Sequence, residues 1–451
     1  MKKAPATVPT RPRDIFKTRA PRYTSYPPAT QFDDSVGPAR AAAWLGAVPA
    51  DEAVSLYVHI PFCRRLCWFC ACRTQGTKTD APLWPYVDAL LREADLVADA
   101  LPGPVRTAHL HLGGGTPTIL PTALIGTLLD GLTARFPADA GAEISIEVDP
   151  AEQDDPRLDA LAAGGVTRAS IGIQDFEPRV QDAIGRPQTP EQTAQVVAGL
   201  SERGIARINF DLLYGLPHQD VETLARTLDK ALDMGPDRLA LYGYAHVPWA
   251  SKRQVMIDAK TLPDGVTRLA LAEMAAERLE AAGYVRIGID HFARPDDPMA
   301  RAARDGTLRR NFQGYTTDTA GTLIGLGASA ISRLPSGHAQ NAARTADWRD
   351  RVRNGRLATV RGHAMTADDD LRARMIERLL CDFALVPAQF GDDALTVRRH
   401  TAEIVLARPD ACTRVPDGSL AIRPEARHEA RLIAMILDAY ATPEGRHSAV
   451  I

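Results

Sequence analysis

Cysteine is scarce in this chain, which has only six cysteines in 451 residues. Cys381 and Cys412 lie far from the other four in the sequence, so we do not expect a disulfide framework. We expect a reducing, cytoplasmic setting instead. A basic excess is also lacking: the formal net charge of -3 argues against a generic nucleic-acid partner. No apolar run of about 18 residues occurs, so no membrane span is expected. The basic N-terminus lacks the apolar centre of a secretory signal. No feature indicates an extended interface, and we expect a monomer.

What the chain does contain is a regular alternation of short β-rich runs and long helical stretches. Six runs predict strands: Ala53–Ile60, Thr107–Leu112, Glu143–Val148, Thr167–Ile173, Ala206–Leu213 and Arg238–Tyr244. Between them, apolar residues recur at i, i+3, i+4 and i+7, as in amphipathic helices. Six such units favour a parallel sheet with right-handed crossovers, whereas a closed eight-stranded barrel would need two more. Gly283–Ala293 is a candidate for a seventh strand.

We therefore predict an α/β fold, namely an incomplete TIM-like barrel of the three-quarter, β6α6 type with one open side. The barrel is expected in residues 51–300. Residues 1–50 are expected to form a basic, proline-rich N-terminal arm and a lead-in helix. The β-α rhythm is lost before about residue 300; the pattern is mixed from there and mostly helical from Asp368 onward. Residues 301–451 are therefore expected to form a mostly helical C-terminal domain that covers the substrate.

Four cysteines are crowded into residues 63–72. Cys63, Cys67 and Cys70 form the pattern C-x3-C-x2-C, and Cys72 adds C-x-C. Four thiolates would satisfy a structural zinc ion, but zinc sites usually pair two short knuckles across a long spacer. A disulfide is the other alternative, and the expected reducing compartment disfavours it. The spacing favours a [4Fe–4S] cluster held by three cysteines, which leaves one iron without a protein ligand.

Glycine-rich and polar residues follow the other predicted strands, at the end of a barrel where active sites lie. Gly113–Gly115 follow the second strand, and backbone without Cβ atoms can approach a ligand closely. Glu147 ends the third strand, Gln174 ends the fourth, and Asp211 lies on the fifth. An acidic side chain in this position is costly unless it is paired or solvated, which favours a ligand-binding role for the two carboxylates.

A three-cysteine motif after the first strand of a partial barrel resembles the radical S-adenosylmethionine (SAM) superfamily. The resemblance implies that the open iron binds SAM and that one electron splits a C–S bond to give a 5′-deoxyadenosyl radical. Further motifs narrow the likeness: RYTSYP, SLYVHIPFC, HLGGGTPT, EISIEVDP, GIQDF, NFDLLYGLP, YAHVP, DHFARPDD and RRNFQGYTT. Together they resemble the oxygen-independent coproporphyrinogen III oxidase (dehydrogenase) family of heme biosynthesis.

This resemblance implies an oxidoreductase that converts two propionates of coproporphyrinogen III into vinyl groups and so forms protoporphyrinogen IX. A hydrogen atom leaves the propionate β-carbon, and CO2 and one electron are then lost. The resemblance also implies two bound SAM molecules and a low-potential electron donor resembling flavodoxin or ferredoxin. The final electron acceptor is not identified by the sequence.

Residue roles follow from the same resemblance. It implies cluster ligation by Cys63, Cys67 and Cys70, and catalytic roles for Tyr57 and His59, although His59 is equally compatible with a satisfied core histidine. The positions that match SAM-contacting ones are Tyr57, Phe69, Cys72, Gly114, Gly115, Thr116, Glu147, Gln174, Arg186, Asp211, Ala245 and Ile331. Because the substrate carries four carboxylates, cationic partners are expected. The arginines in the matching motifs are Arg22, Arg294, Arg309 and Arg310.

Four positions depart from the family pattern. Ala71 replaces a glycine between the last two cysteines, Leu112 a tryptophan and Gly185 an asparagine, and Arg73 follows Cys72. A left-handed backbone at Ala71 would cost about 1 kcal/mol. These departures keep open a paralogous radical enzyme that modifies a tetrapyrrole, and a second alternative is a heme-binding chaperone of the same superfamily. The RYTSYP arm, Cys72 and the NFQGYTT segment favour the oxidase over the chaperone.

Overall fold

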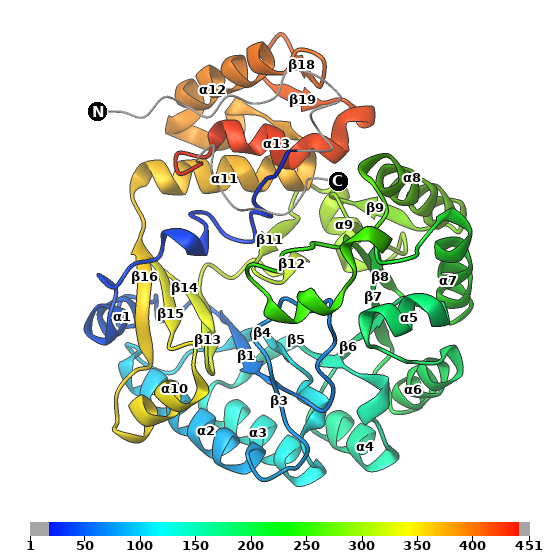
Figure 1. Ribbon diagram of the computed structural model, residues 1–451. Coiled ribbons are helices and arrows are strands. Elements are labelled where there is room, and N and C mark those ends of the chain that lie inside the picture. The colour runs from blue at the N-terminus through cyan, green and yellow to red at the C-terminus, as the bar shows by residue number, and fades with distance from the viewer. Residues whose placement is uncertain (1–17, 442–451) are drawn as a thin grey trace.

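The computed structural model describes residues 18–441, and its centre is a 12-stranded sheet curved into an open-sided barrel (Figure 1). The strand order is β16-β15-β14-β13-β1-β4-β5-β6-β7-β8-β10-β9. β13, β1 and β4 to β8 run parallel, while the strands beyond β13 and β8 pair antiparallel. β16 and β9 remain at the two edges of the sheet, so the predicted incomplete barrel is confirmed.

The six predicted parallel strands are all present, and β5 begins five residues earlier than expected. The strands of the large sheet are β1 (Val54–Ile60), β4 (Thr107–Gly114), β5 (Ala138–Val148), β6 (Arg168–Gln174), β7 (Arg207–Tyr214), β8 (Arg238–Gly243), β9 (Val285–Ile287), β10 (His291–Ala293), β13 (Leu323–Leu326), β14 (Ile331–Leu334), β15 (Gly337–Asn341) and β16 (Thr359–Ala364). Smaller sheets contain β2 (Phe62–Cys63) with β3 (Gln75–Gly76), β11 (Arg309–Asn311) with β12 (Gly314–Thr316), and β17 (Ala384–Leu385) with β19 (Leu420–Ile422) and β18 (Cys412–Arg414).

Helices cover the outside of the barrel, as the figure shows for α2 to α8 (Figure 1). The α-helices are α1 (Pro38–Leu45), α2 (Leu83–Ala100), α3 (Thr122–Arg135), α4 (Asp155–Ala163), α5 (Pro178–Ile184), α6 (Pro190–Glu202), α7 (Val221–Asp233), α8 (Gly265–Ala281), α9 (Pro298–Arg304), α10 (Thr345–Arg353), α11 (Ala367–Asp382), α12 (Ala394–Ala407) and α13 (Ala430–Ala434). Among residues 18–441, no helix has both the length and the apolar character needed to cross a bilayer.

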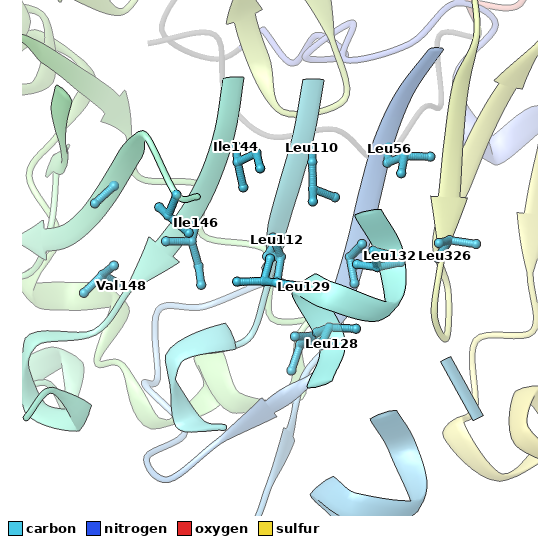
Figure 2. Packing of buried hydrophobic residues seen from close by; sticks show 14 of the residues in the cluster. Leu56, Leu110, Leu112, Leu128, Leu129, Leu132, Ile144, Ile146, Val148 and Leu326 are labelled. Carbon is cyan, nitrogen blue, oxygen red and sulfur yellow. The ribbon is translucent and has the colours of Figure 1, made fainter. Parts of the chain in front are cut away.

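The main core lies between the sheet and its covering helices. Figure 2 shows Leu128, Leu129 and Leu132 of α3 beside Leu110 and Leu112 of β4. The three leucines follow the i, i+1, i+4 pattern of one helical face, and the strand residues alternate, so each element presents an apolar side to the other. Each leucine is at most 2% exposed, and burying one contributes roughly 1.5–3 kcal/mol.

Strand alternation also explains why the inside of the barrel is polar. Leu56 and Val58 of β1 belong to the outer core, so the residue between them, Tyr57, faces the opposite way. The same alternation on β4 and β5 turns His111 and Glu147 away from the outer core. The polar residues at alternate strand positions are therefore gathered on one surface inside the barrel.

Two parts of the chain differ from the expected arrangement. Residues 283–293 form not a seventh parallel strand but the short antiparallel strands β9 and β10, because Gly288 adopts a left-handed φ of 57° and the chain turns back there. Residues 323–364 extend the large sheet through β13 to β16, so the residue-300 boundary does not coincide with the edge of the sheet. The first 17 residues of the expected arm lie outside the described residues.

The described part of the arm packs against the C-terminal helices. Tyr23 and Tyr26 are buried in a cluster with apolar residues of α11, such as Met375 and Leu379. The Tyr23 hydroxyl donates to Asp438 Oδ2 over 3.0 Å, and Ala439 N donates to the Tyr26 hydroxyl over 3.0 Å. In Figure 1 this dark-blue segment runs between the barrel and the orange and red helices. The arm therefore joins the C-terminal part to the open side of the barrel.

Candidate active site

The cysteine loop begins where β1 ends and is closed at its base by backbone pairing. β2 pairs with β3, Gln75 N donates to Pro61 O over 2.7 Å, and Thr77 N donates to Cys63 O over 3.0 Å. Within this closed loop Cys63 and Cys67 are buried, Cys70 is half-buried and Cys72 is exposed. Within residues 18–441, no three His, Cys, Asp or Glu side chains converge at the geometry of a single metal ion.

Two neighbouring segments hold the loop from outside. The Ser251 hydroxyl donates to Cys70 O over 2.9 Å, and Gln254 Nε2 of the 3-10 helix η5 (Lys252–Met256) donates to Phe69 O over 2.7 Å. On the other side Trp68 N donates to Ile184 O over 2.9 Å. These bonds use loop backbone groups and leave the cysteine sulfurs facing the barrel.

The glycine run after β4 lies directly against this loop. Gly115 N donates to Ile60 O over 2.8 Å, and a Cβ on Gly115 would lie 2.6 Å from Phe62 O and 3.0 Å from Cys63 Sγ. Gly114 has a φ of 117°, and a Cβ there would lie 2.6 Å from the His59 ring. Any larger residue would therefore displace the cysteine loop or His59, which is the close backbone approach expected of this motif.

The two predicted carboxylates have different environments. Glu147 accepts a hydrogen bond from Gly114 N over 3.0 Å, and its Oε1 lies 3.6 Å from His111 Nε2. Asp211 accepts from Ser170 Oγ over 2.8 Å and from Asn209 Nδ2 over 3.0 Å. Burial nevertheless raises the pKa of Asp211. Both side chains line the same cavity, where they can accept hydrogen bonds from hydroxyl or ammonium groups.

Arg186 connects the cysteine loop with the ends of two strands. One terminal nitrogen donates to Gly172 O over 2.7 Å, and the other lies 3.3 Å from Asp149 Oδ2 and 3.6 Å from Cys67 Sγ. Arg186 Nε is buried and has no partner among the described residues. Nearby, Gln174 has a left-handed φ of 66°, a strained conformation of the kind found at ligand sites.

Tyr57 and His59 lie behind the glycine run rather than at the cavity surface. Burial lowers the pKa of His59, so its ring is neutral at neutral pH. His59 Nε2 lies 2.9 Å from Arg73 O and must carry the proton to donate to it, which leaves Nδ1 to accept from the Tyr57 hydroxyl over 2.9 Å. The Tyr57 ring also stacks on His111 with 6.0 Å between centroids. In this arrangement the His59 ring occupies the space where a Gly114 Cβ would lie.

A cavity of about 740 Å³ opens from the cysteine loop across the barrel. The predicted site residues that line it are Cys63, Cys67, Phe69, Cys70, Cys72, Gly114, Gly115, Thr116, Glu147, Gln174, Arg186, Asp211, Ala245, Arg22 and Arg310. Most of the predicted site, drawn from every strand end between β1 and β8, is therefore brought together.

Besides Tyr57 and His59, three predicted residues do not line this cavity. Arg294 is exposed and donates to Gly235 O, and Arg309 pairs with Glu377 over 3.0 Å beside a separate cavity of about 470 Å³. Ile331 lies on β14 and presents its backbone to Gly325. Neither arginine lines the cavity at the cysteines, because their strands and turns direct them to the outer surface and to α11.

The sequence analysis did not single out several cavity residues. Arg268 of α8 and Arg431 of α13 lie on helices with ordinary amphipathic patterns, so no local signal distinguishes them from surface arginines. Asp290 lies within the DHFARPDD motif, which does carry a signal. Tyr242 could have been inferred from its place near the end of the sixth predicted strand.

The donor set fits an iron–sulfur cluster with an open iron. Three thiol groups lie in one loop, a glycine cradle touches Cys63, and the buried Arg186 Nε beside Cys67 lacks a partner. A hydrogen bond from the Cys72 thiol lowers the pKa of Cys70 to about 6, whereas burial raises the pKa of Cys63 to about 12, so these two thiols differ in how readily they form the thiolate that binds metal. The loop faces a cavity large enough for further ligands.

Comparisons with known proteins agree with this geometry. The model of the radical SAM superfamily matches residues 57–231. The oxygen-independent coproporphyrinogen III oxidase of Paracoccus denitrificans is 51% identical over 441 residues, which is 97% of this chain and 98% of that protein. The same enzyme of Pseudomonas aeruginosa is 39% identical over 94% of both chains.

This chain belongs to the oxygen-independent coproporphyrinogen III oxidase family. The structure of coproporphyrinogen III oxidase from Escherichia coli, described as a radical SAM enzyme, matches with a TM-score of 0.88 and 37% identity. The match covers 93% of this chain and 98% of that chain. Family membership thus extends over the arm, the barrel and the C-terminal helices.

The departures from the family pattern have structural explanations. Ala71 does not have a positive φ, so the cost of a left-handed alanine does not arise. Gly185 is left-handed with a φ of 65°, a conformation that suits glycine and, next best, asparagine. Leu112 is 2% exposed in the outer core, and Arg73 supplies the carbonyl that fixes His59. Of these four residues, only Ala71 lines the cavity at the cysteines.

Proposed function

We propose that this protein catalyses the oxidative decarboxylation of two propionates of coproporphyrinogen III to vinyl groups, forming protoporphyrinogen IX. The observation that carries the proposal is the three-cysteine loop at the mouth of a large, arginine-bearing cavity. The full-length relatives are named for this activity. Each turnover removes one hydrogen atom from a propionate β-carbon, releases CO2 and passes one electron to an acceptor.

Cys63, Cys67 and Cys70 would hold a [4Fe–4S] cluster, and Gly115 would allow it to approach the backbone. When bound, the cluster and SAM supply one-electron cleavage of a C–S bond and abstraction of a hydrogen atom. Two SAM molecules are expected in this family. The residues proposed to contact them are Tyr57, Phe69, Cys72, Gly114, Gly115, Thr116, Glu147, Gln174, Arg186, Asp211, Ala245 and Ile331.

The chain's own residues support this chemistry by orienting groups and excluding water. Arg186 holds the Gly172 carbonyl, Asp149 and Cys67 in one arrangement, which fixes the floor of the cavity. Glu147 and Asp211 offer acceptors on the same side. The Tyr57–His59 pair packs against Gly114, where there is no room for a side chain, and Glu147 accepts a hydrogen bond from Gly114 N. Closure over the cavity would keep water away from reactive species.

We propose that the arm in residues 1–50 and the C-terminal part in residues 301–451 act as this cover. The burial of Tyr23 and Tyr26 against α11 supports the proposal. We further propose a monomeric, cytoplasmic enzyme that receives its electron from a low-potential donor resembling flavodoxin or ferredoxin. The exposed Arg65 and Arg73 beside the cysteine loop, which hydrogen-bond to backbone carbonyls, would suit an acidic carrier.

The test is an anaerobic reaction with a reconstituted cluster, reductant, SAM and coproporphyrinogen III, followed by mass spectrometry. We expect sequential loss of two formic-acid equivalents, that is, CO2 and two hydrogens for each propionate. Tight heme binding without any turnover would instead identify a heme-binding chaperone. Turnover of a different tetrapyrrole alone would identify a paralogous enzyme. Stoichiometric zinc without iron or sulfide would overturn the proposal.

A further inference from the structure

One wall of the active-site cavity is formed by arginines from four separate segments of the chain. Arg22 comes from the arm, Arg268 from α8, Arg310 from β11 and Arg431 from α13. All four line the cavity that also contains the cysteines. We call them the arginine cluster. Because the four segments are far apart in sequence, only the folded chain creates this concentration of positive charge.

Hydrogen bonds to backbone carbonyls hold three of these guanidinium groups in place. Arg22 donates to Gly243 O over 2.7 Å, and Arg268 donates to Tyr244 O over 2.9 Å. Arg310 donates to Arg22 O over 3.1 Å. A neutral carbonyl fixes the orientation of a guanidinium group but leaves its net charge uncompensated. Within residues 18–441, none of these three arginines forms an ion pair with a carboxylate at 4.0 Å or less.

Part of the hydrogen-bonding capacity of the cluster is unused. Arg268 Nε and one terminal nitrogen of Arg310 are buried and have no partner among the described residues. Leaving such a donor unsatisfied is costly, and the cost is larger for a charged group. The backbone makes room for the arrangement: Gly215 has a φ of 81°, and a Cβ there would overlap the Arg268 guanidinium group. Arg268 and Arg310 therefore each keep a buried donor that a ligand's acceptor can satisfy.

The carboxylate of this cavity whose charge acts on the cluster is Asp290, which acts to raise the pKa values of Arg310 and Arg431. Its Oδ1 is already bonded to His291 Nδ1 over 2.7 Å. Burial, together with the positive charge of Arg22, lowers the pKa of Arg431 to about 10. Gathering several cations in a partly dry cavity is unfavourable unless anions enter it.

We propose that Arg22, Arg268, Arg310 and Arg431 form the recognition site for substrate carboxylates, namely the propionates that are not reacting at the cysteine end of the cavity. This inference rests on the proposed function and adds Arg268 and Arg431 to the residues that determine specificity. While one propionate is at the cysteine end, the remaining carboxylates of the tetrapyrrole extend to the arginine cluster. Guanidinium groups bind carboxylates with paired, charge-assisted hydrogen bonds, so a neutral ester would lose most of this interaction.

The test measures equilibrium binding to the anaerobically reconstituted enzyme. The probes are coproporphyrin III, a fluorescent and unreactive tetracarboxylate, and its tetramethyl ester. The variants Arg268→Gln and Arg431→Gln should each weaken binding of the tetracarboxylate about 10- to 100-fold, since charged hydrogen bonds are lost. Binding of the ester should change less than about 2-fold. Arg294→Gln is the matched control because Arg294 lies outside the cavity, and it should bind both probes as the wild type does.

Two further readouts keep the outcome decisive. Iron content and circular dichroism report whether each variant folds, and Arg22→Gln replaces any helix variant that does not. Equal binding of the tetracarboxylate by wild type and variants would overturn the inference, as would equal losses for acid and ester. Failure of the proposed function would look different, because the wild type would then form no vinyl product even though the binding pattern held.

Discussion

Gly185, at the end of α5, packs directly against the indole of Trp68 in the cysteine loop, and this contact leaves no room for a side chain at position 185. Its φ is 65°, and a Cβ built on it would lie 2.9 Å from Cε2 of the Trp68 indole. The preceding residue, Ile184, accepts a hydrogen bond from Trp68 N over 2.9 Å. The loop that carries the cluster ligands is thus anchored to α5 through both its backbone and its indole.

Replacing this glycine should therefore loosen the cysteine loop. Gly185→Ala combines a left-handed alanine, about 1 kcal/mol, with an overpacked contact of about 1–3 kcal/mol. We expect a loss of unfolding free energy of about 2–4 kcal/mol and reduced iron per chain, measured by denaturant titration and iron assay. Gly204→Ala is the control, since Gly204 has a φ of 80° but open space around it. Equal losses in the two variants would contradict the role assigned to the Trp68 contact.

Serine substitutions should separate the three predicted ligands from the fourth cysteine. Cys63→Ser, Cys67→Ser and Cys70→Ser should each yield protein with little iron or sulfide, because a cluster held by three thiolates tolerates no loss. Cys72→Ser should keep the iron, the sulfide and the visible absorption of the cluster. Iron and sulfide assays after anaerobic reconstitution give the answer. Loss of the cluster in Cys72→Ser would make Cys72 a ligand.

Arg186 should be sensitive even to a conservative change. Lysine has a single ammonium group and cannot reach the Gly172 carbonyl, Asp149 and Cys67 together from one position. We expect Arg186→Lys to lower kcat/KM about 10- to 100-fold while the protein still folds, as circular dichroism would show. Arg203→Lys is the control, because Arg203 pairs with two exposed carboxylates, Asp155 and Asp159. Similar activity in Arg186→Lys and wild type would refute this assignment.

His338 should make stability depend on acid pH. The ring is 5% exposed, donates from Nε2 to Tyr26 O over 3.3 Å and lies between Phe32 and Phe312. Burial lowers its pKa to about 4, and the nearby positive charges of Arg333 and His363 contribute. Between about pH 6.5 and 4 the unfolded chain binds a proton at this site and the folded chain does not, so stability is lost as pH falls.

The matching variant is His338→Gln, which keeps a donor but does not titrate. The wild type should lose about 3 kcal/mol more than the variant between pH 7 and pH 4 in denaturant titrations. The difference between the two profiles removes the contribution of every other titrating group. Parallel pH profiles would show that His338 is accessible to protons in the folded state.

Local patterns in the amino-acid sequence are enough to predict the β-α order, the six parallel strands and the thiol loop. These features rest on local patterns: strand alternation, helical periodicity and the spacing of Cys63, Cys67 and Cys70. Glu147, Asp211 and Gln174 could be placed from sequence too, because residues at the ends of parallel strands must meet at one end of a barrel.

Which arginines face the cavity depends on how distant segments pack in the folded chain. Arg268 and Arg431 lie on ordinary amphipathic helices, and Arg294 lies in a strong motif yet points to the surface. The pairing of β13 with β1, which adds four strands to the sheet, likewise could not be predicted from local sequence patterns. In each case the contact joins segments that are far apart in sequence. Its free energy depends on packing and charge in the folded molecule, and local sequence patterns carry no information about either.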